Sequence, residues 1–393
     1  MSDALGRASP TLNEPYPLIL GTSTLQDVRI KTHHLDALRI IAACAVVILH
    51  YSDYLKGHTA GRFVYEHTQH FNLFVDLFFV ISGFVIASQY MDKVDSIRSV
   101  RRFLWRRLAR IYPLHLATLA FYLIVAAAIH GNLANAGNSA RYPLSDVPAQ
   151  LLLLHALIGE RLTFNFPSWS LSAETFCYAI FPLLVLTAVR RRNLLLLSIA
   201  ILIALNTLFA SITGTGPWAS WINHGGVFRA FPAFILGIVC SLYRDRIARW
   251  RIPPATFTVA LAGFTLLGWS VSETMALGCI YIIAVVAIHC DCAGHHTLMT
   301  RLNIARGSPF TYSCYMLHIP IATIVITLGG RFVSGSPDRE LALLPVAIAV
   351  LAAASVISYR YFETPARNAL NEAFDRWEAG RTVSSMTPRS ESR

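Results

Sequence analysis

The sequence has little charge for its length. Only 14% of its 393 residues are charged, whereas 54% are hydrophobic, and the mean hydropathy is +0.50. A soluble globular domain carries about 25% charged residues. A chain this poor in charge needs an apolar solvent. The composition therefore excludes an ordinary soluble protein and indicates one that is embedded in a lipid bilayer.

Three further absences exclude other protein classes. The seven cysteines lie in or beside apolar runs without regular spacing in polar segments, which excludes the disulfide framework of a small secreted domain. The first thirty or so residues lack the cationic start and the apolar core of a cleavable signal peptide. No internal repeat is evident, which argues against transporter folds built from duplicated halves.

Long apolar runs are what the sequence has instead. A helix that crosses about 30 Å of hydrocarbon needs about 20 mostly apolar residues. The runs predict an all-α, polytopic bundle of about ten transmembrane helices, whereas residues 151–158 are too few to span and should lie at the interface or re-enter. The ten predicted spans are roughly 35–54, 71–90, 111–130, 171–189, 194–213, 226–243, 255–272, 274–290, 309–328 and 341–362.

Lys and Arg are concentrated in every second segment between the predicted spans. With a cytoplasmic N-terminus, 26 of the 33 Lys and Arg residues fall in segments predicted to be cytoplasmic, six fall outside, and Arg229 falls within a span. This is the positive-inside pattern of membrane proteins. It predicts two cytoplasmic termini, with mobile tails at 1–34 and 368–393, and it explains the net charge of +11 without a nucleic-acid partner.

Ionisable residues inside spans cost roughly 2.5–3.5 kcal/mol each on insertion scales, so they are functional candidates by default. Arg39 and His50 are eleven residues apart, which puts them on one face of the first predicted span. Imidazole titrates near neutral pH, as a general base must, although a structural histidine and a snorkelling arginine are the alternatives. Asp76 lies among aromatic residues and should pair with a histidine or an arginine, and the adjacent pair Ser82 and Gly83 favours close helix packing.

A basic segment precedes the third span. Arg107 and Arg110 are three residues apart and therefore share a helical face. Such a segment can simply fix the topology, but arginine forks also bind phosphates. A phosphorylated donor on the cytoplasmic side, such as an acyl-coenzyme A, would fit there.

Other polar residues occur at comparable depth in later spans. Trp169 and Glu174 open the fourth span, Arg229 lies near the outer end of the sixth, and His318 lies midway along the ninth. With straight spans, these side chains should converge with His50 and Asp76 in the outer half of the bundle. The histidines and cysteines at 289–296 match no standard zinc spacing, so we expect a solvated loop and no metal.

Taken in order, these motifs resemble those of the bacterial integral-membrane acyltransferases called acyltransferase family three. The resemblance covers about residues 33 to 367. The residues that carry it are Arg39 with His50, the string from Phe74 to Phe84 around Asp76, Arg107 and Arg110 followed by Ile111-Tyr112-Pro113, the string from Trp169 to Glu174, the string from Thr311 to His318, and Tyr361-Phe362-Glu363-Thr364-Pro365.

The resemblance implies an acyltransferase domain at 35–367 in its stand-alone form, without an added extracytoplasmic hydrolase-like domain. It implies transfer of an acyl group, usually acetyl, from cytoplasmic acyl-CoA to a hydroxyl of a cell-envelope or lipid-linked glycan in the bacterial inner membrane. His50, Glu174 and Asp76 would be catalytic, with a carboxylate orienting His50, and Arg39, Arg107 and Arg110 would hold the donor. Acceptor contacts are expected from Trp169, Ser172, Arg229 and His318.

Two other functions are compatible with buried ionisable residues. A proton-coupled transporter or flippase would use Asp76, Glu174 and His50 as a relay, and a sensor would keep an inactive acyltransferase core. The family motifs favour the enzyme. The sequence leaves open the acyl group, the acceptor, the oligomeric state, and whether transfer is direct or passes through an acyl-enzyme.

Overall fold

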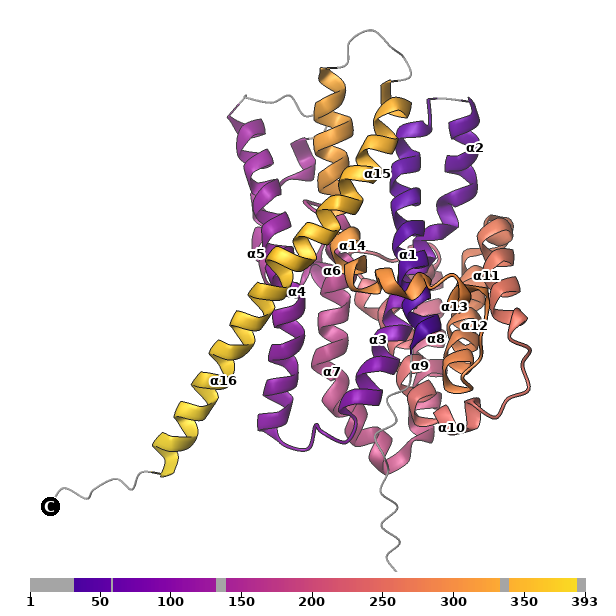
Figure 1. The fold of residues 1–393 in the computed structure, drawn as a ribbon, viewed down its shortest axis with the longest axis vertical. Helices are drawn as coiled ribbons and strands as arrows, with labels where there is room; N and C mark the ends of the chain where they lie inside the picture. Colours follow the sequence, from indigo (N-terminus) through magenta and orange to yellow (C-terminus); the bar gives the residue numbers. More distant parts are fainter. Residues whose placement is uncertain (1–31, 58, 132–138, 333–338, 387–393) are drawn as a thin grey trace, which may run out of the picture. The chain divides into compact units, whose positions relative to one another are not determined.

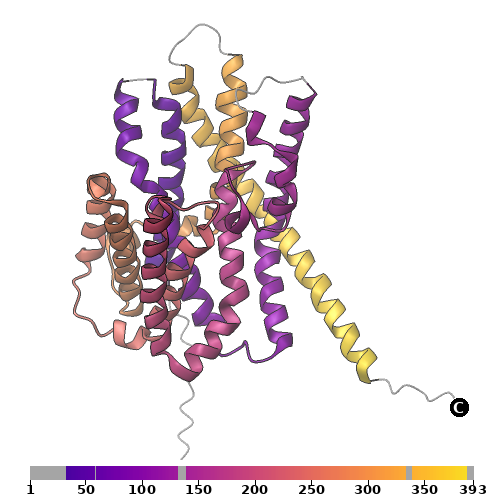
Figure 2. The ribbon, with the colours of Figure 1, turned by 180° about the vertical axis from the view of Figure 1, so that it is seen from behind.

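The computed structural model describes residues 32–57, 59–131, 139–332 and 339–386 (Figures 1 and 2). Every secondary-structure element in these ranges is helical, which confirms the predicted all-α class. The predicted N-terminal tail lies outside the described residues, except for its last three positions. Helix α1 begins there, at His33.

Long helices form the body of the protein and short ones connect them. The α-helices are α1 (His33–Ser52), α2 (Thr59–Thr68), α3 (Phe74–Tyr90), α4 (Ile97–His130), α5 (Val147–Leu151), α6 (His155–Ile158), α7 (Trp169–Arg191), α8 (Asn193–Thr213), α9 (Gly226–Leu242), α10 (Arg244–Ile247), α11 (Ala255–Leu267), α12 (Glu273–Cys292), α13 (Leu298–Arg301), α14 (Thr311–Ala322), α15 (Arg339–Ser358) and α16 (Thr364–Met386). The π-helical segments η9 (Thr323–Leu328) and η11 (Tyr359–Glu363) extend α14 and join α15 to α16.

The helices correspond to the predicted spans. Within the described ranges, eight helical stretches are long and apolar enough to cross a bilayer, so the chain is a multi-pass membrane protein. The remaining two predicted spans coincide with the shorter apolar helices Gly226–Leu242 and Ala255–Ser270. At 1.5 Å per residue, the 17 residues of α9 extend only about 25 Å, so the total of ten crossings stays a prediction.

Helices α3 and α9 cross in very close contact. A Cβ atom added to Gly83 would lie 2.0 Å from the carbonyl oxygen of Phe234, and one added to Gly237 would lie 2.0 Å from that of Val80. Only glycine permits this approach, as is common between membrane helices. The packing role predicted for Gly83 is confirmed, whereas its neighbour Ser82 points into a cavity described below.

The segment between α4 and α7 folds back into the bundle. The carbonyl oxygens of Gln150 and Leu151 accept hydrogen bonds of 2.8 and 2.6 Å from His115 and Tyr112, which lie midway along α4. The side-chain amide of Asn165 donates to the Met316 carbonyl on α14. Of the two alternatives predicted for residues 151–158, an interfacial and a re-entrant segment, these contacts favour the re-entrant one, and α7 begins inside the bundle rather than at its outer surface (Figure 1).

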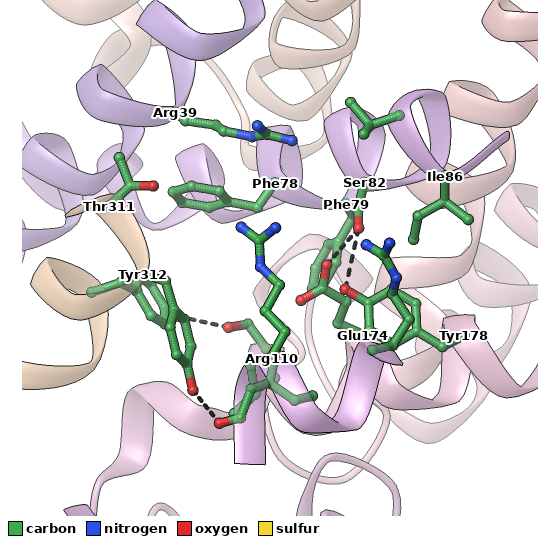
Figure 3. Close-up of a pocket in the computed structure, with 16 residues that line it drawn as sticks. Arg39, Phe78, Phe79, Ser82, Ile86, Arg110, Glu174, Tyr178, Thr311 and Tyr312 are labelled. Atoms are coloured by element: carbon green, nitrogen blue, oxygen red, sulfur yellow. Dashed lines mark hydrogen bonds between the residues drawn. The ribbon is translucent and has the colours of Figure 1, made fainter. Parts of the chain in front are cut away.

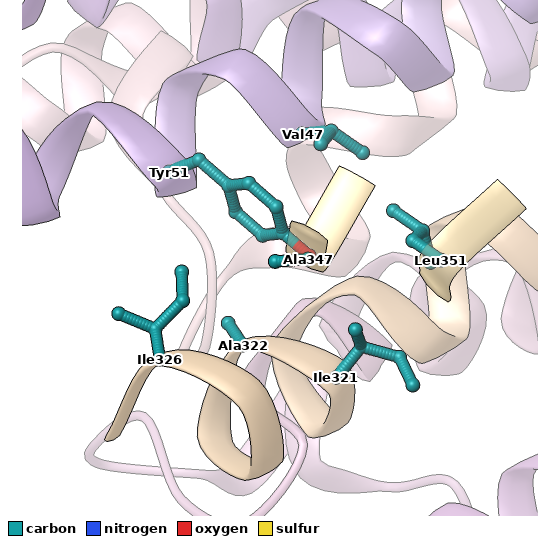
Figure 4. Packing of buried hydrophobic residues seen from close by; sticks show 7 residues of the cluster. All are labelled: Val47, Tyr51, Ile321, Ala322, Ile326, Ala347 and Leu351. Atoms are coloured by element: carbon teal, nitrogen blue, oxygen red, sulfur yellow. The ribbon is translucent and has the colours of Figure 1, made fainter. Parts of the chain in front are cut away.

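An apolar cluster joins α1 to α14 and α15 (Figure 4). Tyr51 lies within it, and its hydroxyl donates a 3.0 Å hydrogen bond to the His318 carbonyl. The cluster fixes the half of α1 that carries His50 against the helix that carries His318. Its buried members are Val47, Tyr51, Ile321, Ala322, Ile326, Ala347 and Leu351.

The C-terminal region differs from the prediction of a mobile tail that starts at 368. Helix α16 continues to Met386 and packs along α4, where Arg101 and Arg102 form ion pairs with Glu378 and Asp375. The indole of Trp105 donates to the Leu370 carbonyl. The acidic residues thus match the basic face of α4, a match between two distant segments that hydropathy alone does not reveal.

The predicted solvated loop at 289–296 is also wrong in its first half. His289 and Asp291 are buried in the last turn of α12. The Asp291 carboxylate accepts hydrogen bonds from the backbone amides of His34 and Leu35 and lies 2.7 Å from the His34 ring nitrogen Nδ1. A carboxylate at the start of a helix satisfies unpaired amides and favours the helix dipole, so Asp291 anchors α1.

Candidate active site

Three arginines and a glutamate from three different helices line one cavity (Figure 3). Arg39 comes from α1, Arg107 and Arg110 from α4, and Glu174 from α7, while Ser82 of α3 completes the group. The cavity has a volume of about 110 Å³. Three guanidinium groups face a single carboxylate here, so the cavity carries an excess of positive charge.

Hydrogen bonds order part of this group. The Ser82 hydroxyl donates to Glu174 Oε1 at 2.5 Å, and Arg107 donates to the Tyr90 hydroxyl at 3.0 Å. Arg39 pairs with Asp36 at the rim, at 3.0 Å. Arg110 has no hydrogen-bond or ion-pair partner within the described ranges. A cationic side chain left unpaired in a cavity is available to an anionic ligand.

A wider cavity adjoins the first one. It has a volume of about 400 Å³, and Arg110 and Tyr312 line both cavities. Two more arginines, Arg306 and Arg367, face the wider cavity. In the sequence, these two residues contribute only to the positive-inside pattern. Their distance along the chain from Arg110 hid the fact that they share a site with it.

Asp76 and Arg229 form a buried ion pair. Arg229 Nη2 lies 2.6 Å from Asp76 Oδ2, and both side chains are fully buried. Arg229 also donates to the carbonyls of Asn72 and Trp221, and its guanidinium lies 5.2 Å from the centre of the Trp169 ring. Asp76 thus has the arginine partner that the sequence predicted. Because its carboxylate faces Arg229, the alternative role of orienting His50 does not fit.

His50 and His318 lie against one another. Their ring centroids are 5.2 Å apart and the two rings are nearly parallel. The His50 ring also contacts Phe166 edge-on. His318 Nδ1 lies 2.6 Å from the Tyr315 carbonyl, which can only accept, so this nitrogen carries the proton. Its Nε2 is buried and has no hydrogen-bond partner among the described residues. A buried acceptor without a partner is rare, and it leaves a lone pair available beside His50.

A third cavity, of about 360 Å³, contains His50. Trp169, Arg229 and Tyr315 line it as well. Tyr315 is the residue that this cavity shares with the arginine cavity. The arginine and histidine cavities are therefore neighbours with a common wall.

The predicted site residues thus fall into two groups instead of one. Glu174 lies with Arg39, Arg107 and Arg110, while His50, His318, Arg229 and Trp169 gather around the other cavity. The prediction that Glu174 joins His50 in the outer half is wrong because it assumed straight spans. The re-entrant segment starts α7 inside the bundle, which carries Glu174 to the arginines.

Ser172 has a structural role and not the predicted role of contacting the acceptor. Its hydroxyl donates to the Leu153 carbonyl at 2.6 Å and accepts from the Ala156 amide at 3.0 Å. The side chain is fully buried and holds the re-entrant segment against α7. We therefore assign Ser172 to the structure of this segment.

Several site residues were missed at the sequence level. Ser82, Tyr178, Tyr312 and Tyr315 all line the arginine cavity. Each carries a hydroxyl within an otherwise apolar span, which is the signal that marks them in retrospect. Within the parts of the chain that the structure describes, no group of three or more His, Cys, Asp and Glu side chains could hold a metal ion.

Known proteins with similar sequences include acyltransferases. A family described as an acyltransferase domain, acyltransferase 3, matches residues 32–360. Acyltransferase MdmB of Streptomyces mycarofaciens is 27% identical over 365 residues, with 82% of this chain and 89% of that protein covered. No solved structure matches the chain.

Two further relatives are longer proteins. Peptidoglycan O-acetyltransferase OatA of Listeria monocytogenes is 25% identical over 85% of this chain, and O-acetyltransferase OatA of Staphylococcus aureus is 24% identical over 86%. The chain spans only 55% and 58% of their lengths. Since the family match covers most of its residues, the chain belongs to the acyltransferase 3 family of membrane O-acyltransferases.

Proposed function

We propose that the protein transfers an acyl group, acetyl in the first instance, from cytoplasmic acyl-CoA to a hydroxyl of a cell-envelope glycan. The observation that carries this proposal is the pair of adjoining cavities, one lined by Arg39, Arg107 and Arg110 and the other by His50. An anion site beside a basic imidazole suits a phosphorylated acyl donor and an acceptor hydroxyl. The bacterial inner membrane is the compartment in which both substrates would be available.

Cavity size indicates how the donor would lie. The arginine cavity, at about 110 Å³, is far smaller than the roughly 300–1,000 Å³ typical of pockets for small-molecule ligands. It admits only the thioester end of an acyl-CoA. The adjoining cavity of about 400 Å³ would hold the nucleotide, with Arg306 and Arg367 on its phosphates. Arg110, which lines both cavities, would contact the middle of the donor.

The reaction then needs a base on the acceptor side. His50 would take the proton of the acceptor hydroxyl as its oxygen attacks the thioester carbonyl. The new ester C–O bond forms, the C–S bond breaks, and the thiolate of CoA leaves and is protonated. His318, whose Nε2 is free within the described structure, is the second candidate for holding a proton there. Trp169 would line the acceptor's path.

Support for a glycan acceptor comes from the relatives. The Listeria relative bears the name of a peptidoglycan O-acetyltransferase. The transporter alternative is less well supported, because Asp76 is bound by Arg229, and Glu174 lines a different cavity from His50, so the three residues of the relay do not lie together.

The test is mass spectrometry of surface glycans from cells with the protein, without it, and with His50→Ala. An acyl mass increment that requires the intact protein is the expected result, and its mass names the acyl group. An identical glycan profile in all three strains would contradict a glycan acceptor.

A further inference from the structure

The Tyr315 side chain separates the two cavities. It lines the arginine cavity together with Glu174, and it lines the histidine cavity together with His50. Only 7% of the residue is exposed. A donor thioester in the first cavity and an acceptor hydroxyl in the second would therefore meet at this residue.

The Tyr315 hydroxyl is fixed on both sides of the wall. It accepts a hydrogen bond of 2.8 Å from Ser170, which lines the arginine cavity. It donates one of 2.9 Å to the carbonyl of Pro167, which lines the histidine cavity. The hydroxyl thus ties the ring to the start of α7 and to the turn that precedes it.

The Tyr315 ring is also held by its neighbours. Its centroid lies 5.8 Å from that of Phe78, another residue of the arginine cavity, and 5.9 Å from that of His318. These contacts place the ring between the anion site and the histidine pair. A movement of this one side chain would connect the cavities without any rearrangement of the helices.

We propose that Tyr315, held by its hydrogen bonds to Ser170 and Pro167, forms a wall between the two cavities. This wall keeps the donor thioester away from water in the histidine cavity until an acceptor displaces the Tyr315 side chain. This inference rests on the function proposed above. Tyr315 is then a positioning residue for the transfer, and the hydrogen bond from Ser170 holds it in place.

A partition matters because water competes with the acceptor. If water reaches the thioester beside His50, it attacks the same carbonyl, the C–S bond breaks, and a free carboxylic acid and CoA result. Closed sites prevent such side reactions, and single side chains or loops often gate them. An enzyme with the donor on one side of a wall and the base on the other avoids this loss while no acceptor is bound.

The test uses the purified full-length protein in lipid nanodiscs with acetyl-CoA and no acceptor. Release of free CoA is measured for the wild type, Tyr315→Ala, Tyr315→Phe and Ser170→Ala, and acetyl-CoA affinity is measured for each. The matched control is Tyr122→Ala, which removes another buried tyrosine that lines neither cavity.

Tyr315→Ala should raise acceptor-independent CoA release by at least about tenfold, because the wall itself is gone. Ser170→Ala keeps the ring but removes its hydrogen bond to the Tyr315 hydroxyl, so it should raise CoA release by about fivefold, the effect of one typical hydrogen bond. Tyr315→Phe removes both hydrogen bonds of the hydroxyl and should raise CoA release by at least as much. Tyr122→Ala should behave as the wild type.

The proposal is overturned if Tyr315→Ala binds acetyl-CoA and releases CoA at the wild-type rate. If Tyr315→Ala fails to fold, wild-type rates in both Tyr315→Phe and Ser170→Ala overturn it equally. A wild-type protein that binds no acetyl-CoA would instead contradict the proposed function, so the two failures are distinguishable.

Discussion

The imidazole of His318 stacks on that of His50 with 5.2 Å between ring centroids, and it presents a buried Nε2 that has no partner in the described structure. Two histidines on different helices thus form one basic centre. Helix α1 carries His50, α14 carries His318, and the cluster around Tyr51 holds these helices together. Under the proposed function, this pair would carry the proton transfer, since Asp76 is paired with Arg229 and Glu174 lines the arginine cavity.

His50→Ala should lower acyl transfer by about 10²- to 10⁴-fold, the usual contribution of a general base, while acetyl-CoA affinity stays at the wild-type level. His318→Ala should lower transfer less if His50 is the base that contacts the acceptor. Transfer rates and binding isotherms of both purified variants check this. A larger loss in His318→Ala than in His50→Ala would reverse the two assignments.

Asp76→Asn should destabilise the protein by about 3–5 kcal/mol, because it leaves Arg229 as an uncompensated buried charge. The double variant Asp76→Leu with Arg229→Met replaces the pair by apolar groups and should recover most of the loss. Unfolding in detergent measures both. Equal destabilisation of the single and double variants would contradict this. It would show that the other contacts of Arg229 stabilise the protein about as much as its pair with Asp76 does.

Arg367→Ala should weaken binding of CoA by about 10- to 100-fold, the worth of a charge-assisted hydrogen bond, and leave the binding of pantetheine unchanged. The reason is that Arg367 faces the wider cavity, where the phosphates would lie. Arg301→Ala is the matched control, since Arg301 is exposed and lines none of these cavities. A parallel loss of pantetheine binding would place the phosphates elsewhere.

Gly83→Ala should lower stability, because its Cβ would lie 2.0 Å from the Phe234 carbonyl oxygen and force α3 away from α9. Overpacking of this kind typically costs about 1–3 kcal/mol. Gly278→Ala is the control: a Cβ there meets no atom within 4 Å, so the change should be neutral or stabilising. Unfolding of the two variants gives the comparison, and equal stabilities would contradict the close crossing.

The sequence was sufficient to predict the all-α membrane class, the positions of the long apolar helices and the arginine group. All three depend on residues that are close together in the sequence. Apolar runs indicate the spans, and the spacing of three residues places Arg107 and Arg110 on one face of α4. The sequence also predicted an arginine or histidine partner for Asp76, though it could not choose Arg229 from among the candidates. That choice depends on the crossing of α3 and α9, which two glycines determine from distant positions.

The position of Glu174 could not be predicted for a related reason. Its depth follows from the re-entrant segment, and that segment is held by hydrogen bonds from Tyr112 and His115 on α4 to carbonyls at 150 and 151. Such contacts leave no periodic pattern in the sequence. Helix α16 is similar, since the ion pairs of Glu378 and Asp375 with α4 stabilise a segment whose hydropathy is that of a polar tail.

The most direct test of the account is a titration of acetyl-CoA into three purified proteins: the wild type, the double variant Arg107→Ala with Arg110→Ala, and His50→Ala. The account predicts that the arginine variant loses affinity by at least about tenfold, whereas His50→Ala binds as the wild type does and fails only in transfer. An arginine variant with wild-type affinity would contradict the assignment of this cavity to the acyl donor.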